Sequence, residues 1–237
     1  AEAETLFAVD PMWCPAGVLP GGPGCTASFA SFAGPTGLIA ALEAGSYAGA
    51  GTIYIASNYN LNEPVILDYG NIGLTDLVFQ GGWDFMFNMV VGETTFKQSV
   101  EFYDWGGYGV PGSLTINDIN LTTLGGDGLY IGSMNDTTTA NVILNNVSIS
   151  NQDNGTYIET SGSVTVNNSE FTQSPWDGID IFADGDVILN NVTASNNAYD
   201  GVYITGDNDY YAGNVSVNGG TFTNNGDGTF DSAYGLN

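Results

Sequence analysis

Carboxylates are the groups with which this chain could do chemistry, because the other usual catalytic side chains are nearly absent. The 237 residues contain 26 Asp and Glu, one Lys, no Arg and no His, which gives a formal net charge of −25. Without His, neither a Ser-His-Asp triad nor a Cys-His pair can form, and the commonest metal ligand is missing. Nucleic acids and anionic membranes are bound through Lys and Arg, so the composition excludes both as partners.

One group of carboxylates has the neighbours that a sugar-active site requires. Asp177 and Asp180 lie in the segment Pro175-Trp-Asp-Gly-Ile-Asp180, next to Trp176, and Asp200 follows one repeat later. Two carboxylates on one face suffice for glycoside hydrolysis. A chain with 26 acids brings some of them together by composition alone. We therefore expect no catalytic residue and keep this group as the basis of an alternative function.

Two acidic turns have the ligands that calcium prefers. Asp184-Gly-Asp186 and Asp207-Asn-Asp209 are separated by 23 residues, and carboxylates, an Asn and backbone carbonyls would supply the oxygen ligands of Ca²⁺. The simpler interpretation is two solvated acidic turns. We expect that no cofactor is required, and the one candidate metal site is calcium at Asp184, Asp186, Asp207 and Asp209.

These side chains are carried by an internal repeat that fills residues 113–237. Each copy has an alternating apolar strand that ends in Asn, a second alternating stretch, an Asp-Gly or Asn-Gly turn and a third short stretch. Three short strands in 22 to 28 residues predict a parallel β-helix with alternate side chains inside the coils. The Asn after the first strand is present in all five copies: Asn117, Asn145, Asn167, Asn190 and Asn218. We interpret this column as a structural ladder, because stacked Asn side chains bond to one another across coils.

An aromatic column is predicted on the outward face of the third strands. The outward positions of successive copies hold Tyr130, Tyr157, Asp180, Tyr203 and Phe230. Rings about 4.8 Å apart can stack on one another and stabilise a solenoid, and the same column could serve as a platform for sugar rings. We favour a ladder of Tyr130, Tyr157, Tyr203 and Phe230 and keep glycan binding as the alternative.

Hydroxyl side chains face outward from the second strands. They form pairs such as Ser148 with Ser150 and Thr221 with Thr223, but Glu170 interrupts the row. A flat Thr-x-Thr face is what solenoid ice-binding proteins use. Ice binding is therefore a less favoured alternative.

Seven Asn-x-Ser/Thr sequons occur in the chain. Asn167 belongs to the inward ladder, which leaves six candidate glycosylation sites: Asn120, Asn135, Asn146, Asn154, Asn191 and Asn214. Asn146 and Asn191 directly follow ladder residues and are expected to face outward, which makes them the better acceptors.

The N-terminal half differs from the repeat. Cys14 and Cys25 are the only cysteines and lie in a segment rich in Pro and Gly, so we predict a disulfide and an oxidising, extracellular setting. Residues 36–45 predict a short amphipathic helix that covers the first coil. No run of 18 apolar residues is present to span a membrane, and no linker divides the chain. We predict one β-helix domain over 1–237, with a disulfide-bearing segment at 1–35, a capping helix and irregular first coils at 36–112, and five regular coils at 113–237.

Several of these segments together resemble a known family. The predicted helix, the strand Thr52-Ile-Tyr-Ile55, the turn Phe79-Gln-Gly-Gly-Trp83 and the Asn-Asn-Val coils resemble right-handed pectate-lyase-like β-helices. They are more closely similar to long repeat-containing secreted surface proteins of environmental bacteria, and the resemblance covers about residues 5–237. Pectate lyases imply calcium held by Asp and an Arg or Lys base. That base has no counterpart here, because Arg is absent and Lys97 falls outside the regular coils.

The same solenoid carries lyases, adhesins and structural proteins, so the resemblance implies the fold and leaves the activity open. We expect an all-β, right-handed parallel β-helix that is secreted or lies at the cell surface. Ala1–Glu4 fit either a mature N-terminus after cleavage or a scar of a secretion leader, and both imply export.

We expect a non-catalytic structural protein, the subunit of a filament, sheath or adhesive layer that assembles head to tail with itself. Nothing comparable to the N-terminal helix covers the last copy, so its open coil edge would pair with a neighbour. A carbohydrate-binding or polysaccharide-degrading β-helix is the alternative, and glycans are then the partner.

Overall fold

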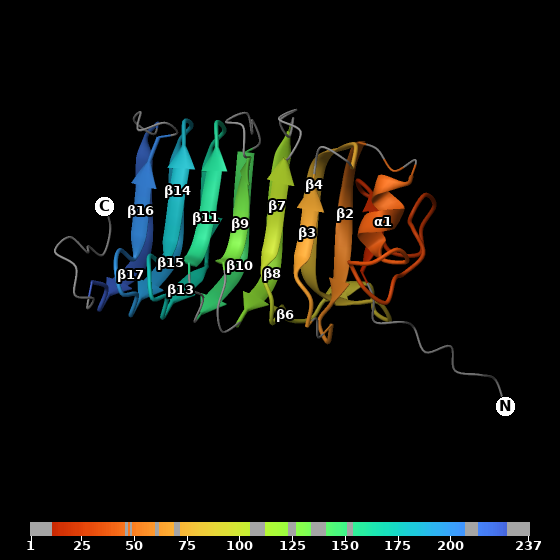
Figure 1. Cartoon of the computed structure of the whole chain (residues 1–237), viewed down its shortest axis with the longest axis horizontal. Helices are drawn as coiled ribbons and strands as arrows, with labels where there is room; N and C mark the ends of the chain where they lie inside the picture. Colours follow the sequence, from red (N-terminus) through yellow and green to blue (C-terminus); the bar gives the residue numbers. More distant parts are fainter. Residues whose placement is uncertain are drawn as a thin grey trace.

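Coils stacked along one axis form the body of the molecule, and their mostly parallel strands pair into two β-sheets (Figure 1). The computed structural model describes residues 11–45, 47, 49–59, 62–68, 72–104, 112–122, 127–133, 141–150, 154–206 and 213–226. The first sheet contains β1 (Met12–Pro15), β2 (Gly49–Ala56), β4 (Leu74–Asp84), β5 (Met89–Val90), β6 (Thr94–Phe96), β8 (Ser113–Leu121), β10 (Asn141–Ser150), β12 (Val164–Asn167), β13 (Glu170–Thr172), β15 (Val187–Ser195) and β17 (Val215–Thr223). The second contains β3 (Val65–Asp68), β7 (Val100–Asp104), β9 (Asp127–Ser133), β11 (Asn154–Thr160), β14 (Ile179–Ala183) and β16 (Val202–Thr205). The predicted all-β parallel solenoid is confirmed.

Strand pairing places equivalent positions of the repeat opposite one another. In the first sheet Leu144 faces Ile116 on one side and Val166 on the other, and all three are buried. Ile143, one residue earlier, points outward and is half-buried. A slip of one residue would turn the whole row of core side chains to solvent, so burial of one face fixes the register. The pairing of β2 with β4 contains register shifts, in agreement with the irregular first coils that the sequence predicts.

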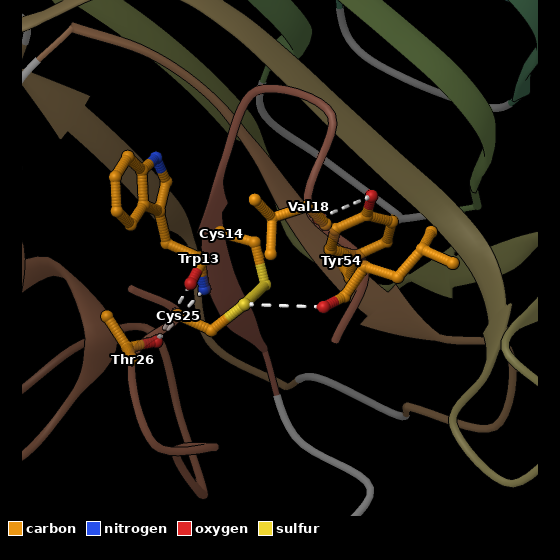
Figure 2. The surroundings of a disulfide bond; sticks show 7 residues. Trp13, Cys14, Val18, Cys25, Thr26 and Tyr54 are labelled. Atoms are coloured by element: carbon orange, nitrogen blue, oxygen red, sulfur yellow. Dashed lines mark hydrogen bonds between the residues drawn. A yellow bond between two sulfur atoms is a disulfide. The ribbon is translucent and has the colours of Figure 1, made fainter. Parts of the chain in front are cut away.

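A disulfide joins the ends of the loop that follows the outermost strand. β1 pairs antiparallel with β2, and its Cys14 is bonded to Cys25, as predicted (Figure 2). Beside it, the backbone N–H of Trp13 donates to the hydroxyl of Thr26 at 3.0 Å. The hydroxyl of Tyr54 on β2 donates to the carbonyl of Val18 at 3.3 Å. The loop is thereby tied to the first coil at its two ends and in its middle.

The helix α1 (Leu38–Glu43) covers the same end of the solenoid (Figure 1). Its Leu38 and Leu42 are buried in the main core. The helix is shorter than the predicted 36–45, because Gly37 at the N-cap has an extended backbone and no side chain caps the first turn.

A ladder of side-chain amides runs along the solenoid at the first bend of each coil. Every member donates from Nδ2 to the amide oxygen one coil earlier, at 2.7 to 2.9 Å: Asn117 to Gln80, Asn145 to Asn117, Asn167 to Asn145, Asn190 to Asn167 and Asn218 to Asn190. The five Asn are the predicted column. Gln80, at the end of Val78-Phe-Gln80, is a first rung that the search for Asn alone misses.

The residue after each ladder position turns the chain. Asp118, Asn146, Asn168 and Asn191 have φ values of 50 to 54°, a left-handed conformation that Asn and Asp adopt more readily than other non-glycine residues. The turn also shifts the phase of burial, because Leu144 before Asn146 and Val147 after it both point into the core. In each Asn-Asn pair of the repeat, the first Asn therefore forms a rung of the ladder and the second forms the bend.

We predict that Asn190→Ala destabilises the fold more than a change at the neighbouring bend residue. The substitution leaves the Oδ1 of Asn167 and the Nδ2 of Asn218 without their partner, and we expect a loss of about 1–3 kcal/mol in the free energy of unfolding. Asn191→Gly is the matched control, because Gly accepts the left-handed backbone and the residue is exposed. Urea unfolding of both variants measures the difference, and equal losses would contradict a ladder role for Asn190.

Candidate functional site

The three carboxylates singled out in the sequence come together where two neighbouring coils enter the second sheet. Asp177 and Asp200 precede β14 and β16, and Asp180 lies on β14. The Oδ1 of Asp177 accepts a hydrogen bond of 2.6 Å from the backbone N–H of Asp200, and Asp180 lies close enough for the charges of Asp177 and Asp200 to act on its carboxyl. Asp200 is only 6% exposed. The cluster therefore joins two coils.

Burial changes the protonation of this cluster. Burial, followed by the negative charge of Asp177, raises the pKa of Asp180 to about 7. Burial likewise raises the pKa of Asp177. The Oδ1 of Asp180 has no hydrogen-bond partner among the described residues. Near neutral pH Asp180 is therefore protonated in about half of the molecules, whereas a carboxyl in water is ionised, and a protonated carboxyl is a hydrogen-bond donor and a general acid.

An exposed aromatic stack lies next to the carboxylates along the chain. The rings of Trp176 and Tyr199 have centroids 4.9 Å apart and an angle of 5° between their planes. Trp176 is 50% exposed. A sugar has an apolar ring face and polar hydroxyl groups. An exposed aromatic ring can pack on the ring face while neighbouring polar groups bind the hydroxyls.

The aromatic column is continuous over five rings, and it differs from the predicted one. The stacked members are Tyr103, Tyr130, Tyr157, Phe182 and Tyr203, with centroid distances of 4.8 to 6.0 Å between neighbours. Asp180 does occupy the outward position between Tyr157 and Tyr203, but Phe182, two residues further along β14, supplies the ring. Phe230 lies outside the described residues. Tyr130 and Tyr157 lie nearly parallel, with 7° between their planes, and the other neighbours contact one another at angles of 32 to 55°. These contacts along the axis favour the ladder over a sugar platform.

The outward hydroxyl row is in register but chemically mixed. Ser148, Glu170, Thr193 and Thr221 face one another across β10, β13, β15 and β17. Glu170 is exposed in the middle of this row. Because Glu170 interrupts the row, the hydroxyls do not form the regular array that the ice-binding alternative requires.

The predicted calcium site at Asp184, Asp186, Asp207 and Asp209 falls only partly within the described residues and stays a prediction. The Oδ1 of Asp186 accepts hydrogen bonds from the backbone N–H and the Nδ2 of Asn214, at 2.8 and 3.0 Å. Its partner therefore lies 28 residues downstream, because the extra residues of the last long repeat come between β16 and β17. Asp184 is exposed, and Asp207 and Asp209 lie outside the described residues. Among the described residues no three potential ligands from His, Cys, Asp and Glu gather to hold a metal ion.

The candidate glycosylation residues occupy different environments. Asn120 is half-buried on β8, whereas Asn146, Asn191 and Asn214 are exposed. The three exposed ones use Nδ2 within the solenoid, as donors to Asp118, Asn168 and Asp186 respectively. Asn135 and the side chain of Asn154 lie outside the described residues.

A comparison with known families agrees with this geometry. The family model described as right handed beta helix region matches residues 93–236, which is more than half of the chain. The chain belongs to the right-handed β-helix family. No curated protein and no solved structure matches it significantly.

This right-handed β-helix carries its one basic side chain on the surface. Lys97 is exposed directly after β6. With no second Lys or Arg in the sequence, the β-helix has no cationic group to add to the carboxylate cluster. The six-residue α1 is too short to cross a bilayer, and no other described segment forms a longer apolar helix.

We predict that Asp180 makes the β-helix less stable as pH rises. Its pKa is about 7 in the folded chain against an ordinary value of 3.8, so the folded state binds the extra proton between these values. The proton on Asp180 adds on the order of 2–4 kcal/mol to the free energy of unfolding. This contribution is fully present below about pH 4 and is lost as the pH rises through 7. Asp180→Asn should flatten this dependence and raise the melting temperature at pH 8, whereas the exposed Asp184→Asn should not. Melting curves from pH 4 to 8 that run parallel for wild type and Asp180→Asn would contradict the assignment.

Proposed function

We propose that this β-helix is a secreted, non-catalytic structural protein, a subunit of a filament, sheath or adhesive layer that assembles head to tail with itself. The disulfide between Cys14 and Cys25 supports a setting outside the reducing cytoplasm. Two further features support a structural role: the contacts that join each coil to the next, and the difference between the β1 and β17 sides of the solenoid.

The side chains at the bends and on the second sheet support a scaffold role. The amide ladder from Gln80 to Asn218 and the ring stack from Tyr103 to Tyr203 both join coil to coil. Contacts repeated in this way make the solenoid resist bending and separation of its coils. A rod of this kind holds whatever it joins at a fixed distance.

The observation that carries the proposal is the edge presented by β17. Val187 and Leu189 of β15 are fully buried, but their partners on β17, Val215 and Val217, are 49% and 38% exposed. At the opposite end β1 and α1 cover the first coil. An exposed strand with apolar core-side residues is a template for another coil. Because the two ends differ, repeated contact between them builds a linear filament.

We predict that Val217→Lys weakens self-association by about tenfold or more, since the contact would bury a charge. Ser216→Lys is the matched control, because Ser216 faces Ile188, an outward position of β15. Sedimentation velocity over a concentration series and electron microscopy of the unmodified chain measure assembly. A wild-type chain that stays monomeric at high concentration would rule out the proposal.

Carbohydrate binding is the second candidate, favoured by the exposed Trp176, which stacks on Tyr199 and directly precedes Asp177 in the chain. The same geometry speaks against hydrolysis by Asp177 and Asp180. Glycosidases need a carboxylate that is free to attack the sugar or to activate water, whereas the Oδ1 of Asp177 already accepts the backbone N–H of Asp200, and Asp200 is buried. Neutral and cationic polysaccharides are the favoured ligands, because a chain of charge −25 repels polyuronates.

We predict that Trp176→Ala abolishes any retention of the chain on insoluble chitin or cellulose and that no reducing sugar is released. Pull-down with each polysaccharide and a reducing-end assay measure the two quantities. Ile66→Ala serves as the control, because Ile66 is an exposed apolar residue of β3. Equal retention of wild type and Trp176→Ala would remove Trp176 as the binding residue.

A further inference from the structure

A rigid hairpin extends from the second coil of the solenoid. β4 continues to Asp84 and returns as β5, with Trp83 opposite Val90. At the tip, the Oδ1 of Asp84 accepts hydrogen bonds from the backbone N–H groups of Met86 and Phe87, at 2.8 and 3.1 Å. These bonds hold the tip in one conformation, so its side chains are presented in a defined arrangement.

The tip of this hairpin is apolar and exposed. Five of the ten exposed large apolar side chains among the described residues belong to it: Met86, Phe87, Met89, Val90 and Val91. Met86 is 71% and Phe87 68% exposed. No residue from 85 to 92 carries a charge. A soluble protein rarely exposes so many adjacent apolar side chains unless the surface binds something.

The base of the hairpin packs against the N-terminal end of the solenoid. Trp83 contacts Tyr54 of β2 with ring centroids 4.5 Å apart, and Trp83 and Phe85 belong to the apolar cluster around Cys14 of β1. The hairpin therefore crosses the first coil toward β1. β17 lies at the other end of the molecule (Figure 1).

We infer that the hairpin of one copy packs against the β17 edge of a second copy. The inference rests on the head-to-tail assembly proposed above and names the surface that receives the edge. Residues 213–226, which form the last described coil, contain no charged side chain. In a chain of charge −25, contact through two surfaces without charged side chains avoids the repulsion that other faces would meet. The exposed Val215 and Val217 supply the apolar counterpart of Met86 and Phe87.

A paired cysteine experiment tests the contact directly. Phe87→Cys and Val217→Cys are prepared as separate full-length variants and mixed under mild oxidation; the described cysteines are already paired with each other. We expect a mixed disulfide between the two variants as the main product. A Phe87→Cys dimer as the main product would overturn the inference in favour of a symmetric hairpin contact.

A second measurement separates this inference from the proposed function. The double variant Phe87→Ser, Met89→Ser should weaken assembly at least tenfold, whereas the control Ile66→Ser should assemble as wild type. If Val217→Lys blocks assembly and the double variant does not, the result supports the filament and rules out the hairpin contact. If the wild-type chain never assembles, both fall. Binding of monomeric wild type to phosphatidylcholine vesicles that the double variant loses would overturn the inference in favour of a lipid surface.

Discussion

The register between coils is the constraint on which the rest of the structure depends. In a parallel solenoid each residue lies opposite its equivalent one coil away, about 4.8 Å along the axis, so like side chains stack on like. This suits amides, because an amide is both donor and acceptor, and the ladder from Gln80 to Asn218 is unbroken. It also suits rings, as in the nearly parallel stack of Tyr130 on Tyr157.

Carboxylates are the side chains that this stacking does not suit, since an ionised carboxylate only accepts. The described acids meet the difficulty in two ways. Asp118, Asp177 and Asp186 each accept an N–H from the adjoining coil, so a donor replaces the second acid. Asp180 stands between two tyrosines in its row but close to Asp177 and Asp200, and it keeps a proton. At Asp118, Asp177 and Asp186, acids are compatible with stacked coils because an amide or a backbone N–H of the adjoining coil faces each of them.

The repeat predicts those features that depend on register alone. Asn190 was placed correctly because its neighbours in the ladder recur at the same place in every copy. Phe182 was missed because a ring can lean two positions along a strand to complete a stack, which a column of aligned letters does not reveal. The hydrogen bond from Asn214 to Asp186 was not predicted, because repeat spacing does not say where in a long coil the extra residues lie. The Met86–Val91 hairpin is outside the repeat, and its exposure follows from tertiary packing of Trp83 and Phe85 on the N-terminal end.

The same constraint gives the two ends of the solenoid different characters. Within the body every coil is covered by another coil of the same pattern, so a residue such as Leu189 is buried without any special device. Beyond β2 the next coil of the repeat is replaced by other elements. The N-terminal end uses an antiparallel strand, a helix and a disulfide loop. The described β17 coil keeps Val217 in the core column and Asn218 as the last rung, although Gly220 stands opposite the buried Val192. The β17 surface is therefore complementary to a segment that pairs with it as a further coil, or to an apolar surface that covers Val215 and Val217. This is why the uncharged apolar hairpin at the other end of the molecule is the surface that we match to it.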